Sequence, residues 1–133
     1  MLSDEEKNLL FQEAAKASKN SYSPYSNYPV GASVITDSGK IYSACNVENA
    51  SYSLTICAER VAISKAIADG DCNLKAIAIF SPHGDLSPCG ACRQFIIEFG
   101  KEIETIYQIN GTLKSKKIQE LIPDSFTTEN LQW

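Results

Sequence analysis

The sequence predicts an α/β fold, a three-layer α-β-α sandwich in which helices cover both faces of a mixed five-stranded sheet. The predicted elements follow one another as helix, hairpin, helix, strand, helix, strand, strand. One strand, Leu74–Phe80, is an almost unbroken apolar run, as expected where both faces of a strand are covered. The length of 133 residues and a hydrophobic content of 44% fit one compact domain over residues 1–133.

The first predicted helix spans Ser3–Asn20. Ser3 and Glu6 have the spacing of a capping box, in which each side chain accepts a hydrogen bond from the other residue's backbone N–H. Leu10 and Ala14 lie four residues apart and give this helix an apolar face.

Residues 21–29 form a loop of tyrosine, serine, asparagine and proline. Its three tyrosines either cover the edge of the core or place a ring against a flat ligand, and the sequence leaves both interpretations open. The segments Val30–Ile35 and Lys40–Cys45 are predicted strands joined by a turn, so they form a hairpin. The polar segment 46–53 follows, at a strand end where α/β folds place ligands.

The second predicted helix is Thr55–Asp69, with Thr55 as its N-cap and Gly70 as its C-terminal stop. The remaining predicted elements are a helix at Cys89–Phe99, a strand at Ile103–Ile109, a short strand at Thr112–Lys116 after the Asn110-Gly111 turn signal, and one helical turn at Ile118–Leu121. The polar tail that follows carries two aromatic residues that we expect to be exposed, Phe126 and Trp133.

The net charge of −4 argues against a partner such as nucleic acid, because binding to phosphates depends on Lys and Arg. No stretch approaches the roughly 20 apolar residues that span a bilayer, so we expect no membrane partner. The acidic segment Met1–Glu6 lacks the basic start and apolar centre of a signal peptide, which favours a cytoplasmic protein. In a reducing compartment, a Cys-x-x-Cys spacing indicates metal or redox chemistry rather than a disulfide.

Two short motifs carry the predicted chemistry, Cys57-Ala58-Glu59-Arg60 and Pro88-Cys89-Gly90-Ala91-Cys92. Both begin helices that follow strands of one sheet, so the helix N-termini can meet at one edge of that sheet. Helix N-termini carry partial positive charge and lower the pKa of nearby thiols, and the thiolate is the form that binds zinc. The sequence therefore predicts one Zn²⁺ per subunit, held by Cys57, Cys89 and Cys92.

Three protein ligands and one open position are typical of catalytic zinc, whereas a fourth ligand would make the site structural. Cys45, Cys72 and His83 are the candidates for a fourth ligand, and their places in the sequence favour none of them. Glu59, two residues after a ligand, is then expected to carry protons between a zinc-bound water and the substrate. The alternative is that Glu59 is an ordinary surface residue of the helix.

Arg60 is predicted to donate a hydrogen bond to a ligand sulfur. Three thiolates together with Zn²⁺ leave one excess negative charge, which would make a bound water less acidic. The guanidinium of Arg60 and the two helix dipoles would compensate for that charge.

From Tyr22 to Phe126 the chain resembles the small zinc-dependent cytidine deaminases. The two cysteine motifs are common to many zinc deaminases, and the most discriminating segment is Cys45-Asn46-Val47-Glu48-Asn49-Ala50-Ser51-Tyr52. The resemblance implies a cytidine deaminase-like fold and a homotetramer with its sites at subunit interfaces. It also implies hydrolysis of cytidine and deoxycytidine to uridine and deoxyuridine plus ammonia, as part of pyrimidine salvage.

The resemblance further implies which residues contact the nucleoside. Asn46 and Glu48 would bind the ribose hydroxyls, the Glu48 carboxylate through a strong charge-assisted hydrogen bond. The backbone at Ala58 would bind the edge of the base, and Glu59 would contact its ring nitrogen.

Two aromatic residues complete the implied site. Tyr28 stands where the family usually has Phe, as a ring lying against the base or the sugar. Phe126 matches a tail aromatic that reaches into a neighbouring subunit's site in the four-subunit members. Asp124-Ser125 precedes it where the family often has glycine.

Three other functions are compatible with parts of the sequence. The same chemistry could act on another aminopyrimidine or on a nucleoside antibiotic, although Asn46 and Glu48 argue against this. Editing of RNA or DNA is disfavoured by the net charge of −4. A structural zinc domain would need a fourth protein ligand and would leave Glu59 dispensable.

Overall fold

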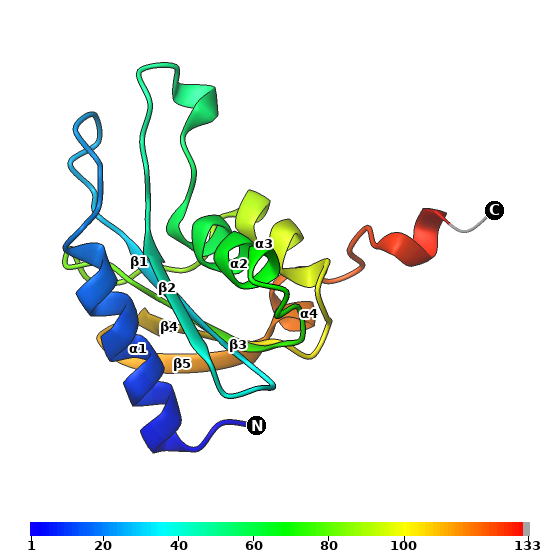
Figure 1. Cartoon of the computed structure of the whole chain (residues 1–133). Coiled ribbons are helices and arrows are strands. Elements are labelled where there is room, and N and C mark those ends of the chain that lie inside the picture. Colours follow the sequence, from blue (N-terminus) through cyan, green and yellow to red (C-terminus); the bar gives the residue numbers. More distant parts are fainter. Residues whose placement is uncertain (132–133) are drawn as a thin grey trace.

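The computed structural model describes residues 1–131, and its elements follow the order that the sequence predicts (Figure 1). Trp133 lies outside the described residues. The elements are α1 (Asp4–Ser18), β1 (Gly31–Thr36), β2 (Ile41–Cys45), η1 (Tyr52–Leu54), α2 (Ala58–Ala68), β3 (Leu74–Phe80), α3 (Gly90–Ile97), β4 (Glu104–Ile109), β5 (Thr112–Lys117), α4 (Ile118–Leu121) and η2 (Thr128–Leu131). The five strands form one mixed sheet in the order β2-β1-β3-β4-β5, with β3 and β4 parallel and the other neighbours antiparallel.

Helices cover both faces of this sheet, as predicted, with α1 on one side and α2 and α3 on the other (Figure 1). Along β3, Ala76 and Ala78 lie in a core that includes Leu10 of α1. The intervening Ile77 lies in a second core that includes Ile63 of α2. Successive side chains of a strand point to opposite faces, so a strand covered on both sides must be apolar throughout its length.

The capping box at the start of α1 is confirmed. Ser3 Oγ accepts a hydrogen bond from the backbone N–H of Glu6 at 3.2 Å, and Glu6 Oε1 accepts one from the N–H of Ser3 at 3.0 Å. The helix packs so closely on β1 that a Cβ at Gly31 would lie 1.8 Å from the carbonyl oxygen of Ala14. Glycine is therefore required at this crossing because no side chain fits between the helix and the strand.

The start of the second helix differs from the prediction. The N-cap of α2 is Cys57 and the helix begins at Ala58, so the prediction of Thr55 as N-cap is wrong. Val47 and Ile56 form an antiparallel bridge with two backbone hydrogen bonds, which keeps the chain extended as far as Cys57. The Thr55 hydroxyl instead accepts a hydrogen bond from the N–H of Asn49 at 3.2 Å.

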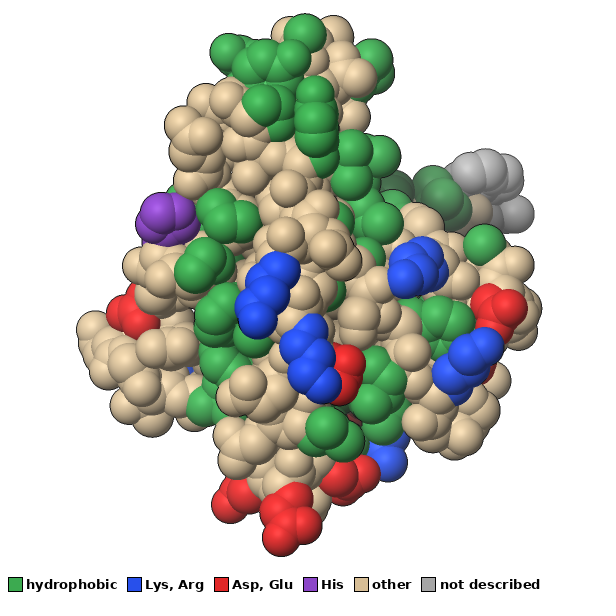
Figure 2. All heavy atoms as spheres, turned by 60° about the vertical axis from the view of Figure 1, so that its left-hand side comes forward, with side chains coloured by type: hydrophobic (Ala, Val, Ile, Leu, Met, Phe, Trp, Pro, Cys, Tyr) green, Lys and Arg blue, Asp and Glu red, His purple; other side chains and the backbone are tan. Residues whose placement is uncertain are grey.

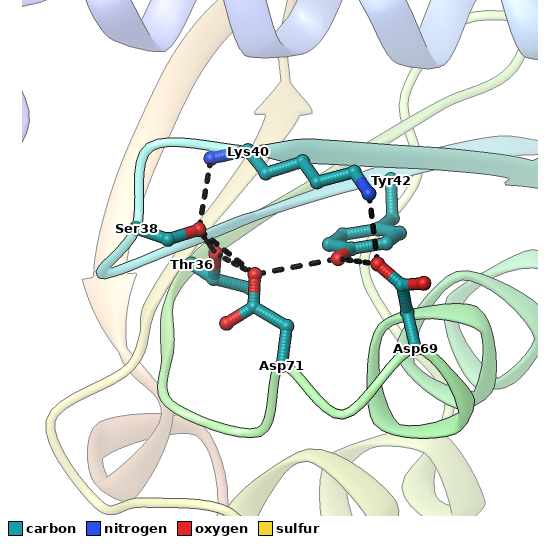
Figure 3. A network of polar contacts seen from close by, with 6 residues as sticks. All are labelled: Thr36, Ser38, Lys40, Tyr42, Asp69 and Asp71. Carbon is teal, nitrogen blue, oxygen red and sulfur yellow. Dashed lines mark hydrogen bonds and ion pairs between the residues drawn. The ribbon is translucent and has the colours of Figure 1, made fainter.

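A polar network ties the far end of α2 to the β1–β2 hairpin (Figure 3). Four hairpin side chains donate hydrogen bonds to two carboxylates that follow the helix. The pairs are Lys40 and Tyr42 with Asp69, at 2.8 and 2.6 Å, and Thr36 and Ser38 with Asp71, at 2.7 and 2.8 Å. The opposite end of α2, which carries Cys57, lies near the start of β1 and the end of β2, where Cys57 shares a pocket with Val30 and Asn46.

Two further predictions are confirmed. Asn110 and Gly111 both have positive φ, 53° and 73°, as a tight hairpin turn between β4 and β5 requires. The centre of β3, residues 76–79, is buried on both faces. Within residues 1–131, none of the helices has the length and apolar character needed to cross a bilayer.

We predict that Gly31→Ala lowers the free energy of unfolding by about 2 kcal/mol or more, because the new methyl group would push α1 off the sheet. Denaturant unfolding followed by circular dichroism measures this. Gly90→Ala is the matched control, since a Cβ there meets no atom within 4 Å. Equal stability of the two variants would contradict the packing described for α1.

Candidate metal centre and active site

Three thiols lie together where the N-termini of α2 and α3 meet. Cys57 is the N-cap of α2, Cys89 is the N-cap of α3, and Cys92 lies in the first turn of α3. Their sulfur atoms all lie within 4.8 Å of one another. Neither N-cap side chain caps a backbone N–H of its own helix, so both sulfur atoms keep lone pairs available for a metal. The sequence correctly predicts that these three residues meet.

The donor set fits zinc. Zn–S bonds of about 2.3 Å at tetrahedral angles separate the sulfur atoms by about 3.8 Å, which the observed cluster accommodates. Sulfur donors favour zinc over magnesium or calcium. A hydrogen bond from the Cys92 thiol, followed by one from Arg60, lowers the pKa of Cys57 to about 5. The same shared proton, together with burial, raises the pKa of Cys92.

Arg60 makes the contact that the sequence predicts. Its Nη2 donates to Cys57 Sγ at 3.5 Å and to the carbonyl oxygen of Thr55 at 3.5 Å. The guanidinium therefore lies beside the thiol cluster and stabilises negative charge on Cys57.

Glu59 lies in the first turn of α2, and its side chain is buried, with 5% of the residue exposed. Burial raises the pKa of its carboxyl above the ordinary value. The Glu59 side chain lines a pocket of about 140 Å³. The pocket is lined by Val30, Asn46, Thr55, Cys57, Ala58, Glu59, Leu86, Ser87 and Cys89. A buried carboxyl and two of the thiols therefore face one small cavity.

Asn46 lies in the same pocket and is held by the preceding loop. Its Nδ2 donates to the carbonyl oxygen of Tyr28 at 2.9 Å. Its Oδ1 accepts from the N–H of Val30 at 3.0 Å and from the hydroxyl of Ser21. The second N–H of the Asn46 amide donates to none of the residues 1–131.

Glu48 is bound by the same loop. Its carboxylate accepts from the N–H of Tyr25 at 2.9 Å, from the N–H of Ser26 at 3.1 Å and from the Ser26 hydroxyl. The hydrogen bond from that hydroxyl is the main reason why the pKa of Glu48 is lowered. Glu48 lines a second pocket, of about 340 Å³, with Tyr25, Ser26, Tyr52 and Thr55. Thr55 lines both pockets, so the two adjoin.

Two of the predicted site residues lie apart from the Glu59 pocket within this chain. The ring of Tyr28 stacks on His83, with centroids 5.0 Å apart and planes 17° from parallel. Phe126 is 58% exposed, and its carbonyl oxygen accepts a hydrogen bond from Gln94 Nε2 at 2.8 Å. Neither side chain lines the pockets that Glu48 and Glu59 face.

The three candidates for a fourth ligand, Cys45, Cys72 and His83, lie outside the group formed by the three close thiols. Cys45 lines a groove formed by α1, β2 and α2, and Cys72 is exposed beyond the far end of α2. His83 contacts Tyr28, and its Nε2 lies 3.1 Å from the carbonyl oxygen of Asn27. Among residues 1–131, the group of close ligand atoms consists of Cys57, Cys89 and Cys92.

The sequence analysis missed several residues of this region. Leu86 and Ser87 line the pocket ahead of Cys89. Arg93 donates to the carbonyl oxygens of Pro88 and Leu121, both at 2.8 Å, and so fixes the turn that enters α3. An arginine one helical turn after Cys89 is visible in the sequence and could have been predicted to hold this turn.

Comparisons with known proteins agree with this geometry. Residues 4–108 match the family described as the cytidine and deoxycytidylate deaminase zinc-binding region. The cytidine deaminase of Sporosarcina psychrophila is 43% identical over 127 residues, which cover 93% of each chain. The crystal structure of cytidine deaminase from Burkholderia pseudomallei is 41% identical, with a TM-score of 0.84, and covers 94% of this chain and 100% of its own.

A relative with another substrate is also found. The blasticidin-S deaminase of Bacillus cereus is 35% identical over 107 residues, which cover 74% of this chain and 76% of that protein. The names of these relatives therefore differ in the molecule given as substrate. The chain belongs to the cytidine and deoxycytidylate deaminase family, and it is a zinc-dependent hydrolytic deaminase.

Proposed function

We propose that this deaminase converts cytidine and deoxycytidine to uridine and deoxyuridine with release of ammonia, in pyrimidine salvage. The buried carboxyl of Glu59, facing the same pocket as Cys57 and Cys89, is the observation that carries the proposal. At about 140 Å³ the pocket is smaller than the roughly 300–1,000 Å³ of sites for drug-sized ligands. It therefore suits a single base ring, with the sugar lying outside it.

Cys57, Cys89 and Cys92 are the proposed zinc ligands. When bound, zinc would supply the activation of a water molecule for attack at neutral pH. Glu59 would accept one proton from the attacking water and deliver it to the ring nitrogen of the base, and would then carry the second proton of that water to the departing amine. The C4–N bond breaks, a carbonyl replaces the amine, and ammonia leaves. The backbone at Ala58, which lines the pocket, would hold the edge of the base.

The contacts of Asn46 and Glu48 support recognition of one sugar hydroxyl. An ionised carboxylate has about four acceptor sites, and the loop donates to three of those on Glu48. The amide of Asn46 has two N–H groups, and one of them is bound to Tyr28. One acceptor and one donor remain, which is what a single hydroxyl requires. The 3′-hydroxyl occurs in both cytidine and deoxycytidine, so both fit.

Tyr28 is the proposed aromatic neighbour of the nucleoside. The bond from Asn46 to its carbonyl oxygen places the residue beside the side chains that would bind the sugar. The stack on His83 holds its ring parallel to a second ring.

A second candidate substrate is an aminopyrimidine nucleoside antibiotic, because the blasticidin-S deaminase of Bacillus cereus is a relative. An enzyme for cytidine needs the donor and acceptor pair of Asn46 and Glu48, whereas one for a substrate without a ribose hydroxyl does not. Relative values of kcat/KM for cytidine and blasticidin S distinguish the two.

A homotetramer with sites at subunit interfaces is proposed as the working form, in the cytoplasm, where a reducing environment keeps the thiols free. Figure 2 shows apolar side chains gathered at the upper end of the molecule, where Figure 1 places the loop around η1. The exposed large apolar residues of this loop and the tyrosine loop are Tyr22, Tyr25, Val47, Tyr52, Leu54 and Ile56. Such a patch is typical of a protein interface. A second copy of the chain would cover it, and the exposed Phe126 would enter a neighbour's site.

Zinc-loaded protein is expected to convert cytidine to uridine, followed as a shift in ultraviolet absorbance, and a chelator should abolish the conversion. Glu59→Gln should lower kcat by on the order of 10²- to 10⁴-fold, since the proton carrier is lost. Its zinc content by elemental analysis should not change. Glu5→Gln, on the exposed start of α1, is the control. Full turnover by Glu59→Gln would overturn the proposed function.

Arg60→Ala is expected to raise the pH at which activity appears. Loss of the guanidinium beside Cys57 leaves the thiolate charge uncompensated, so the attacking water holds its proton more tightly and a higher pH is needed to remove it. The pH profile of kcat, measured with bound zinc quantified at each pH, checks this. An unchanged profile in a fully loaded variant would count against the role of Arg60.

Phe126→Ala should lower kcat/KM in a homotetramer, because each site would lack the neighbour's ring. Mixing and refolding this variant with Glu59→Gln should restore part of the activity. In the mixed tetramer some sites combine an intact Glu59 with an intact Phe126 from the adjacent subunit. If kcat/KM of the refolded mixture is no higher than that of the two variants alone, Phe126 does not act across subunits.

A further inference from the structure

Ser26 lies at the centre of the contacts between the tyrosine loop (residues 21–29) and Glu48. Its hydroxyl donates to Glu48 Oε2, and its backbone N–H donates to Glu48 Oε1 at 3.1 Å. The N–H of Tyr25 also donates to Oε1, at 2.9 Å. Two donors therefore fill the two acceptor sites of Oε1, whereas Oε2 has one donor among residues 1–131 and keeps its other site open there. The Ser26 hydroxyl decides which site of Oε2 is free.

The same hydroxyl also joins Glu48 to Asn46. Ser26 Oγ accepts a hydrogen bond from the N–H of Tyr28 at 3.0 Å. The carbonyl oxygen of Tyr28 accepts from Asn46 Nδ2 at 2.9 Å. Both predicted sugar-binding side chains are thus joined through two residues of one loop. A shift of Ser26 would alter the position of both.

The backbone around Ser26 is held in a tight turn. Asn27 has a φ of 55°, in the left-handed region, and its N–H donates to the carbonyl oxygen of Ser23 at 3.0 Å. On the other side, the N–H of Glu48 donates to the carbonyl oxygen of Tyr22 at 2.8 Å. These contacts bring the turn around the carboxylate.

Ser26 also faces the space where the sugar would lie. Together with Glu48 it lines the pocket of about 340 Å³ that adjoins the Glu59 pocket at Thr55. A base held beside Glu59 would place its sugar toward this second pocket. The free site of Oε2 and the Ser26 hydroxyl are therefore on the sugar side.

We propose that Ser26 is a positioning residue for sugar recognition, whose hydroxyl holds the Glu48 carboxylate so that its one free acceptor site meets the 3′-hydroxyl of the nucleoside. The proposal rests on the proposed function, since it requires a substrate with that hydroxyl. Ser26 takes no part in proton transfer and acts only through Glu48.

The test compares cytidine with 3′-deoxycytidine in the wild-type protein and in Ser26→Ala. We expect Ser26→Ala to raise KM for cytidine by on the order of tenfold, because a charge-assisted hydrogen bond orienting the carboxylate is lost. The value of kcat should stay within about twofold of wild type. For 3′-deoxycytidine, which cannot donate to Glu48, KM should be the same in both proteins.

Ser26→Thr retains a hydroxyl and should restore most of the preference for cytidine. Ser64→Ala removes an exposed serine of α2 and should leave both substrates unaffected. The ratio of kcat/KM for the two substrates does not depend on the folded fraction of enzyme, so partial unfolding of a variant cannot imitate the expected result.

Three outcomes would overturn the proposal. If Ser26→Ala loses the same factor on both substrates, Ser26 has a structural role only, and the proposed function stands. If it loses nothing on either substrate, Glu48 is positioned without Ser26. If the wild-type protein does not distinguish cytidine from 3′-deoxycytidine, the assignment of Glu48 to the sugar fails, and Ser26 has no role in recognition.

Discussion

The meeting of two helix N-termini is the constraint on which the rest of the structure depends. Bringing three thiols within 4.8 Å is unfavourable for their ionised forms, because like charges repel and burial removes solvent. The partial positive charges of two helix starts and the guanidinium of Arg60 offset this repulsion. The N-termini of these two helices must therefore be held close together, and the sheet beneath them provides the common base.

The anchors on both sides of the thiol cluster are polar rather than apolar. At the far end of α2, Asp69 and Asp71 hold the helix to the β1–β2 hairpin, as Figure 3 shows. At the start of α3, Arg93 holds the entering turn through backbone carbonyl oxygens. Apolar packing alone lets helices slide, whereas directional hydrogen bonds at their ends restrict where a Cys sulfur can lie. The stability of the core and the geometry of the site thus have different sources.

The loop between the hairpin and α2 joins Glu48 to the thiol cluster. The Val47–Ile56 bridge lies between Glu48 on one strand and Cys57 on the other. The two backbone hydrogen bonds of this bridge tie the segment that carries Glu48 to the residue before the N-cap of α2. The tyrosine loop closes over Glu48 from the other direction through Ser26. The residue proposed to bind the sugar and the thiol cluster consequently share one backbone frame.

Local patterns in the sequence determined most of the secondary structure and the thiol cluster. The Ser3–Glu6 capping box, the apolar run of β3 and the Asn110-Gly111 turn act over a few residues, so their signals are complete in a short window. The spacing of Cys89 and Cys92 likewise marks one helix start.

Only the tertiary structure decided where α2 begins and which side chains position Glu48. The Val47–Ile56 bridge overrides Thr55 as a cap, and Ser26 reaches Glu48 across 22 residues of sequence. The stack of Tyr28 on His83 spans a still longer separation. Such contacts depend on how distant segments are brought together by the sheet, and no periodicity or capping signal near either residue records them.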